Sequence, residues 1–316
     1  MMNERPSARY LSLDSRLRAL FGEKVQKIPL DAGSTCPNRD GVLSTGGCTF
    51  CNAEGSGTGQ AALSLREQWD AWRERLRRSP RTRHTRLFLG YLQAFTNTYG
   101  PASRLRALLD ELSALPDLAG ACVGTRPDCL DEEKMALMAR LPFQEFWLEI
   151  GAQSCSNATL ARINRHHSAE DTERAVRLAA GFGVPVCLHL MAGLPGESDE
   201  DFLQTVRWAA TLPIRGVKLH NLYFPKGTVV NAQRLEGRLA PLDQEQYAAL
   251  AARALTLLPS SVVIHRLCAD PAPGELASPS WALDKGGTLH LIRAVLEYNN
   301  WWQGKACNCP DQNPFA

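Results

Sequence analysis

Residues 35–59 read TCPNRDGVLSTGGCTFCNAEGSGTG and place three cysteines within sixteen residues of a glycine-rich segment. Eleven residues separate Cys36 from Cys48, two separate Cys48 from Cys51, and the next cysteine along the chain is Cys122. Cysteine thiolates are the usual protein ligands of iron–sulfur clusters, and a [4Fe–4S] cluster normally takes four of them. Three close thiolates with no fourth nearby therefore predict a cluster that leaves one iron open to a small molecule.

Zinc and a disulfide are the alternative interpretations of these cysteines. A structural zinc site needs four protein ligands, and a catalytic site usually has histidine among its three. No histidine lies between Cys36 and His84. Since the start of the sequence lacks a signal peptide, we expect a reducing compartment, in which disulfides are rare. The motif favours a cluster over zinc.

The composition is typical of a globular enzyme. The 316 residues are 44% hydrophobic and 22% charged, with a net charge of +2. No run of about 20 apolar residues is present to span a bilayer, so we expect a cytoplasmic protein with no membrane partner. Ten cysteines in such a chain indicate metal chemistry or small buried side chains. Because the charge is nearly balanced, a nucleic-acid partner has to be argued from local patches.

Short apolar runs alternate with amphipathic stretches after the cysteines, which predicts an α/β fold with a parallel sheet and right-handed crossovers. One further strand before the cysteines gives six strand–helix units, the number in a partial (β/α)6 TIM-like barrel. The expected strands are 86–91, 119–124, 145–150, 184–190 and 216–222, and the expected helices are 63–78, 101–115, 131–140, 168–182 and 198–212.

Three segments are expected along the chain. Residues 1–30 form a lead-in helix and strand, residues 31–235 form the partial barrel, and residues 236–316 form a small C-terminal extension. A proline- and glycine-rich stretch at 269–280 separates the end of the barrel from a last helical segment at 286–300.

Polar and glycine-rich residues follow the predicted strands. Barrel enzymes carry their chemistry at the carboxyl ends of the strands, so these residues should converge on one rim. They are Gln93, Thr96, Asn97, Thr98, residues 125–128, Gln153, Gly193, Pro195, Gly196, Glu197 and residues 226–228.

Four motifs together resemble the radical S-adenosylmethionine (radical SAM) enzymes. They are CPNRDGVLSTGGCTFC at 36–51, EIGAQS at 149–154, INRHH at 163–167 and HLMAGLPGE at 189–197. More narrowly, the chain resembles a YhcC-like subfamily. The motifs that carry this resemblance include QAFTNTYGP, GTRPDCL and, near the end of the sequence, WQGK. The eleven-residue cysteine gap is similar to that in the radical SAM domain of the Elongator catalytic subunit.

This resemblance implies a [4Fe–4S] cluster and SAM as cofactors. Cys36, Cys48 and Cys51 would hold three irons, and the amine and carboxylate of SAM would bind the fourth. Reductive cleavage of SAM would give a 5′-deoxyadenosyl radical, which removes a hydrogen atom from the substrate. An electron donor such as flavodoxin or ferredoxin is implied as a partner. The resemblance assigns no catalytic residue of the protein itself.

The resemblance also implies several contacts with SAM. Phe50 would lie against the adenine, and Gln153 would contact the ribose. Arg165, twelve residues later, would bind the methionine carboxylate, for which a guanidinium fork is well suited. The alternative for Arg165 is an ordinary charge at a helix end.

Four further residues are assigned to the cofactor pocket. Glu149 and His189 would point from strand ends toward SAM, and Gly193 and Gly196 would form a turn that passes close to it. The alternative for His189 is a residue of the core or barrel lumen with its hydrogen bonds satisfied. A glycine-rich turn of this kind also occurs as a plain strand-to-helix connection.

The Elongator resemblance suggests a tRNA wobble uridine, or its side chain, as the substrate. Seven arginines between residues 73 and 86 could grip RNA phosphates beside the active-site mouth, although such runs are more often a solvated helix face. A small metabolite or porphyrin-like substrate is the alternative within the enzyme class. A zinc-stabilised nucleic-acid-binding module is the alternative outside it.

Cys307 and Cys309 form a C-x-C pair near the end of the sequence. Two cysteines are too few to close a metal site. We therefore favour the absence of a metal here, and plain surface thiols and a redox pair both stay open.

Overall fold

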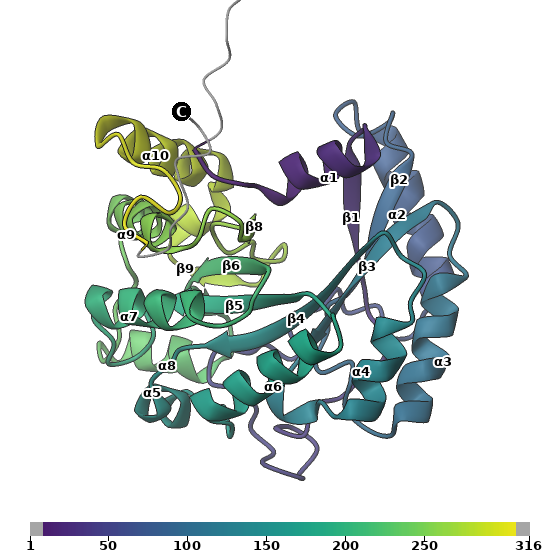
Figure 1. The fold of residues 1–316 in the computed structure, drawn as a ribbon. Helices are drawn as coiled ribbons and strands as arrows, with labels where there is room; N and C mark the ends of the chain where they lie inside the picture. The colour runs from purple at the N-terminus through teal and green to yellow at the C-terminus, as the bar shows by residue number, and fades with distance from the viewer. Residues whose placement is uncertain (1–8, 308–316) are drawn as a thin grey trace, which may run out of the picture.

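A computed structural model describes residues 9–307. Its centre is a seven-stranded, wholly parallel sheet in the order β1-β2-β3-β4-β5-β6-β8. The sheet curls into an open half-barrel with helices on its outer face (Figure 1). The strands are β1 (Val25–Leu30), β2 (Leu87–Leu92), β3 (Leu118–Thr125), β4 (Glu145–Gln153), β5 (Val186–Ala192), β6 (Gly216–Asn221) and β8 (Val263–Arg266).

Six helices between or after the strands cover the outer face, and most begin at a side-chain cap. Ser64, Ser168 and Ser198 each form a capping box with an acidic residue three positions later, which satisfies free backbone N–H groups of the first turn. The helices are α2 (Leu65–Arg78), α3 (Ala102–Ser113), α4 (Glu132–Ala139), α6 (Ala169–Gly181), α7 (Asp199–Ala210) and α9 (Gln244–Leu257).

The partial-barrel prediction is confirmed, and a seventh strand extends it. The five strands expected after the cysteines and the one expected before them are all present. The additional strand, β8, comes from the segment expected to form a C-terminal extension and pairs with β6. It was missed because it has only four residues, two of them polar. The division into three segments stays a prediction.

Successive residues of each strand face opposite sides of the sheet. On β4, Leu148 and Ile150 pack in the large core beneath the helices. Trp147 belongs to a second cluster inside the barrel, and Glu149 lines a cavity above it. The lumen therefore changes from apolar to charged as the strands run toward their carboxyl ends.

Helix α1 (Leu13–Phe21) closes the amino-terminal end of the half-barrel. It packs on both edge strands, β1 and β8, and Ser12 forms a parallel bridge with Ile264 of β8. Leu13 and Leu17 are buried in the apolar cluster of the lumen, while Arg16 binds the buried Glu145 at the start of β4. This end of the barrel is filled with side chains.

The remaining elements surround the open end and the last strand. No helix in the described part of the chain is both long and apolar enough to cross a bilayer. These elements are η1 (Pro127–Cys129), α5 (Asn157–Arg162), the antiparallel pair β7 (Phe224–Pro225) and β9 (Leu276–Ser278), α8 (Val229–Leu235), η2 (Ser280–Leu283) and α10 (Lys285–Tyr298).

Candidate active site

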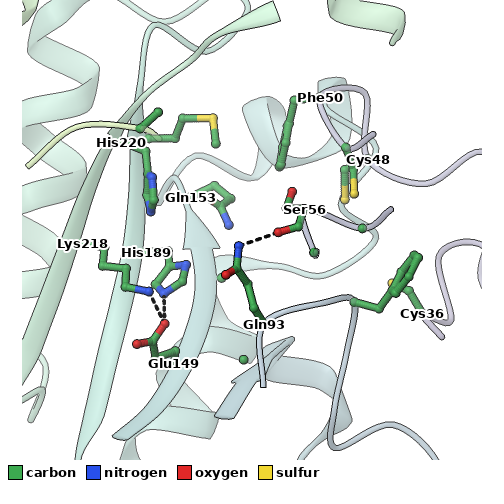
Figure 2. Close-up of a pocket in the computed structure, with 18 of the residues that line it drawn as sticks. Cys36, Cys48, Phe50, Ser56, Gln93, Glu149, Gln153, His189, Lys218 and His220 are labelled. Carbon is green, nitrogen blue, oxygen red and sulfur yellow. Dashed lines mark hydrogen bonds and ion pairs between the residues drawn. The ribbon is translucent and has the colours of Figure 1, made fainter. Parts of the chain in front are cut away.

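A cavity of about 240 Å³ opens at the carboxyl ends of the strands. The cysteine loop forms one wall, and charged residues of the lumen form the other. Figure 2 shows Cys36, Cys48 and Phe50 across from Glu149, His189 and Lys218. The sequence-predicted residues Cys36, Cys48, Cys51, Phe50, Glu149, Gln153, Arg165 and His189 all line this one space.

Backbone hydrogen bonds hold the cysteine loop over the barrel. Gly47 N donates to Asn38 O at 2.7 Å, which closes the loop on itself. Thr49 N donates to Ile163 O at 3.1 Å, and Thr49 O accepts from Val230 N at the same distance. The segment between Cys48 and Cys51 is therefore anchored to the residue after α5 and to the first turn of α8.

Two glycines let the loop approach the residues that follow β2. A Cβ atom on Gly55 would lie 2.5 Å from the ring of Phe95, and one on Gly57 would lie 2.5 Å from Ala94. Gln93 Nε2 also donates to Ser56 O at 2.5 Å. The glycine-rich composition thus serves close packing of the loop against the barrel rim.

The three cysteines have the chemistry that a cluster requires. None is in a disulfide, and all three face the cavity. Asn38 Nδ2 lies 3.5 Å from the sulfur of Cys48, and Arg165 Nη1 lies 3.3 Å from it. Burial raises the pKa of Cys51 to about 11, and a bound metal would overcome this by deprotonating the thiol. Residues 9–307 contain no group of three His, Cys, Asp or Glu side chains already gathered around one point for a metal ion.

Arg165 is fixed by three contacts. Besides the sulfur of Cys48, its Nε donates to His167 Nε2 at 3.0 Å, and its Nη2 donates to Gly151 O. A Cβ atom at position 151 would lie 3.0 Å from this guanidinium and 2.8 Å from the amide of Gln153. Gly151 therefore makes room for two of the predicted SAM contacts. Gln153 itself has a left-handed backbone, with φ 71°, at an irregularity of β4.

Glu149 is the centre of the charged wall. Its carboxylate is fully buried, contacts Lys218, and lies 3.0 Å from Lys27 Nζ and 3.0 Å from His189 Nε2. Burial alone would raise the pKa of Glu149, but the ammonium groups of Lys218 and Lys27 outweigh it and hold the pKa well below its usual range. Glu149 is therefore a carboxylate at neutral pH.

The other titratable groups of this wall are shifted by burial. Burial lowers the pKa of Lys218 to about 8 even though it contacts Glu149, and its Nζ lies 3.2 Å from the hydroxyl of Tyr91. Burial also lowers the pKa of His189 to about 4 and that of His265 to about 3. Both imidazoles are neutral at pH 7.

Gly193 and Gly196 are placed differently from the other predicted residues. They lie in the turn after β5, and the cavity lining does not include them. A Cβ atom on Gly193 would lie 3.2 Å from Leu242, and one on Gly196 would lie 2.3 Å from the guanidinium of Arg162. This packing explains why glycine stands there, and the proposed contact with SAM stays a prediction. Of the C-x-C pair, Cys309 lies outside the described residues.

Sequence reasoning missed the cations of the lumen. Lys27 and Lys218 stand in the otherwise largely apolar strands β1 and β6, and Arg266 ends β8. The signal was present in GVKLHN, where Lys218 and His220 are two residues apart and so face the same side of the sheet. A lysine inside an apolar strand of a barrel indicates a partner in the lumen.

The arginine-rich stretch is remote from the cavity, and its expected place beside the mouth is wrong. It runs from the end of α2 to the start of β2, and Arg73 binds Asp117 just before β3. These are the amino ends of the strands, about 20 Å from the carboxyl ends for strands of this length. Arg77 and Arg78 are 62% and 77% exposed and pair with Glu74. The solvated helix face is the correct interpretation.

Solved structures and curated relatives agree with this fold. The archaeal Methanocaldococcus infernus Elp3 with an N-terminal deletion superposes with a TM-score of 0.66 over 88% of this chain and 64% of its own, at 19% identity. The tRNA uridine(34) acetyltransferase of the same organism is 30% identical over 152 residues, which are 47% of this chain and 28% of that protein.

Similarity over nearly the whole length is found with two bacterial proteins. YtqA of Bacillus subtilis is 35% identical over 94% of this chain and 92% of its own. YhcC of Escherichia coli K12 is 35% identical over 92% of this chain and 93% of its own. The family model of the radical SAM superfamily matches residues 36–209, and the model of the radical SAM C-terminal domain matches residues 214–298. The chain is a member of the radical SAM superfamily and an enzyme of that class.

Proposed function

We propose that Cys36, Cys48 and Cys51 hold a [4Fe–4S] cluster at this cavity and that SAM binds beside it. The observation that carries the proposal is that three thiols of one loop face the same enclosed space as the charged groups of the lumen. When bound, the cluster supplies an electron from a reductant such as flavodoxin or ferredoxin, and SAM supplies the 5′-deoxyadenosyl radical for C–H activation. The cofactors carry this chemistry, and the protein contributes placement and exclusion of water.

The residues around Cys48 orient the cofactor side of the cavity. Asn38 and Arg165 direct N–H groups at the sulfur of Cys48, and such hydrogen bonds tune the reduction potential of a cluster. Arg165 also offers a charged fork to a carboxylate, and Gln153 offers an amide to the ribose. Phe50 and Met191 both pack against the buried cluster of Leu160, Ile163 and Leu194 and form an apolar wall for the adenine.

We assign the opposite wall to the substrate, which replaces the SAM contact predicted from the sequence for Glu149 and His189. Glu149, Lys218 and His189 form a connected polar set on the side away from the cysteines (Figure 2). Charged groups in a water-poor cavity interact with a ligand more strongly than they would in bulk water. They can therefore fix the direction in which a substrate C–H bond faces the cofactor.

We further propose a tRNA wobble uridine, or its side chain, as the substrate. The support is the sequence similarity to the tRNA uridine(34) acetyltransferase of M. infernus, which matches 47% of this chain. A base reaches an enclosed site when it is turned out of its strand. A small metabolite is the alternative, and the tRNA experiment below decides between them.

The cluster and SAM assignments are tested by reconstitution under anaerobic conditions. We expect brown protein with a broad visible absorption band, bound iron and sulfide, and production of 5′-deoxyadenosine from SAM with dithionite as reductant. Cys48→Ala should lose most of the iron and all SAM cleavage. Cys155→Ala, at a cysteine outside the cavity lining, is the matched control and should retain both. Colourless, zinc-loaded wild-type protein would overturn the proposal.

The substrate assignment is tested in cells. Transfer-RNA nucleosides are compared between a deletion strain, the same strain complemented with the wild-type gene, and the strain complemented with Cys48→Ala. We expect one modified uridine to change in the deletion, to be restored by wild type and not by the variant. Identical nucleosides in all strains would favour the small-metabolite alternative while leaving SAM cleavage in vitro unaffected.

A further inference from the structure

The wall of the cavity away from the cysteines carries a cation that forms no ion pair within the described residues. Glu149 is the carboxylate of this wall, and it is shared by Lys27 and Lys218. The side chain of Lys218 is only 4% exposed. A third cation, Arg266, lines the same cavity. Charges withdrawn from water are normally paired, yet Arg266 lines the cavity without forming an ion pair within the described residues.

A distortion of β8 directs Arg266 into the cavity. The pairing of β6 with β8 steps from Val217 opposite Ile264 to Lys218 opposite Arg266, which skips His265. Such a bulge lets two consecutive residues face the same side of a sheet. Accordingly, His265 reaches the carboxylate of Glu149 at 3.7 Å, and Arg266 lines the cavity as the register neighbour of Lys218.

Arg266 has no ion-pair partner within the described residues. Of the two other acids that line the cavity, Asp270 is in an ion pair and Glu275 has neutral hydrogen-bond donors only. Asp270 binds Lys285 at 2.8 Å. Glu275 Oε1 accepts hydrogen bonds from Asn52 Nδ2 at 2.7 Å and from the hydroxyl of Tyr223 at 3.0 Å. Both acids line the cavity, yet neither forms an ion pair with Arg266.

A second unsatisfied group lies on the same wall. His220 lines the cavity from β6, and its buried Nε2 atom has no hydrogen-bond partner in the described part of the chain. Its neighbour His189 lies 5.4 Å away between ring centroids. Arg266 forms no ion pair within the described residues, and His220 Nε2 has no hydrogen-bond partner there. Both groups can therefore bind a polar ligand in the cavity.

The cofactor side has cations of its own. Arg165 lies against the sulfur of Cys48, and Arg39 donates to the backbone oxygens of Cys51 and Asn52. Lys218 and Glu149 are drawn on the far side of the cavity from Cys36 and Cys48 (Figure 2). Arg266 is the register neighbour of Lys218, so we place it on that far side.

We propose that Arg266, with Lys218 beside it, is an anion-binding site that holds a carboxylate or phosphate group of the substrate. This deepens the proposed function and rests on it, since it assumes that the substrate enters on this wall. A guanidinium fork can bind either group through two parallel hydrogen bonds. The anion anchors the substrate at the floor of the cavity, and the C–H bond to be attacked then faces the cysteine loop.

The test uses reconstituted, SAM-loaded protein titrated by calorimetry with sodium acetate and, separately, with inorganic phosphate at constant ionic strength. Wild type should bind at least one of them saturably. Arg266→Gln should weaken that binding about tenfold or more, since it removes a charged, two-point contact, and Arg266→Lys should retain part of it. Arg215→Gln, at an exposed arginine just before β6, is the matched control and should bind as wild type. Tighter acetate indicates a carboxylate substrate, and tighter phosphate indicates a nucleotide phosphate.

Three results would overturn the anion site. The first is that wild type binds neither anion saturably. The second is that Arg266→Gln binds the anion as tightly as wild type. The third is that Arg266→Gln binds SAM more weakly, which would assign the arginine to the cofactor. Iron content and SAM cleavage are measured on the same samples. If the wild-type protein binds no iron and does not cleave SAM, the result counts against the proposed function instead. The anion titration is then carried out on protein without SAM.

Discussion

The guanidinium of Arg165 lies 3.3 Å from the sulfur of Cys48 although the two residues are 117 positions apart in the sequence. Arg165 is itself 7% exposed and bound to the backbone of β4 through Gly151. The cysteine loop is thereby connected to the carboxyl end of the central strand. Any group held by Cys48 lies within reach of a buried positive charge.

Replacing Arg165 should weaken the binding of SAM. Loss of one charge-assisted contact costs about 1.5–3 kcal/mol, which corresponds to roughly a tenfold to hundredfold change in affinity. Arg165→Ala should show this loss in calorimetric titration of reconstituted protein, and Arg165→Lys should lie between the two. Iron content separates damage to the cluster from loss of SAM. Unchanged SAM affinity in an iron-replete Arg165→Ala protein would contradict the assignment.

Removing the charge of Glu149 should destabilise the fold. Glu149→Gln leaves the buried Lys218 and the partly buried Lys27 without their counterion, and breaking a buried ion pair from one side costs about 3–5 kcal/mol. Denaturant unfolding of the protein without cluster measures the free energy of unfolding. The matched control is Glu236→Gln, which removes the exposed pair with Arg238 and should change the free energy by at most about 0.5 kcal/mol. Equal effects of the two substitutions would refute a structural role for Glu149.

The free energy of unfolding should fall as the pH is lowered from about 6.5 to 5. Burial holds the pKa of His265 at about 3 and that of His189 at about 4, so both stay neutral in the folded state. The unfolded chain protonates histidine below about 6.5 and therefore binds more protons. Each such histidine contributes a slope of roughly 1 kcal/mol per pH unit in this window.

His265→Gln should remove its share of that slope, and His84→Gln, at an exposed position, serves as the control. The comparison is made by denaturant unfolding of the cluster-free protein at several pH values. A slope that is the same in wild type and His265→Gln would show that this imidazole is not held neutral by burial.

Changing Arg77, Arg78 and Arg81 together to Ser should leave SAM cleavage and tRNA affinity unchanged. These arginines lie at the amino ends of the strands, whereas the cavity opens at the carboxyl ends. The fold should also be retained, because exposed ion pairs such as those with Glu74 contribute little stability. Binding of tRNA is measured over a range of salt concentrations. A shallower salt dependence in the triple variant would mean that RNA does cross this end of the barrel.

Most of the sheet could be predicted because buried parallel strands read as short apolar runs. The runs at β2 and β4 are of this kind, and the helices that precede them, α2 and α4, begin at the side-chain caps Ser64 and Asp131. β8 reads VIHR and has no such signal, since its strand character comes from pairing with β6. Likewise, no local pattern in α1 reveals that it will contact two edge strands far apart in sequence.

Sequence motifs predicted the cysteines, Arg165, Glu149 and His189 as residues of one pocket, and the structure puts them in one lining, whereas the cations of the opposite wall were not predicted. Cys36, Cys48 and Arg165 belong to short sequence motifs that carry the resemblance to the radical SAM enzymes. Lys27 and Arg266 are single cations on the first and last strands of the sheet. Their meaning depends on the barrel curling so that both reach the surroundings of Glu149, which is a tertiary relationship.

Leu13 and Leu17 fill the lumen beneath the charged layer, so within the described residues the amino-terminal end of the half-barrel is closed and the cavity lies at the carboxyl ends of the strands. A molecule that enters at this end and reaches Lys218 passes the cysteine loop, because both line the same cavity. A cofactor and a substrate that both enter at this end share one path. The molecule bound nearer the opening then blocks the release of the one bound deeper. We expect the two to bind in a compulsory order, with turnover limited by the departure of the outer ligand.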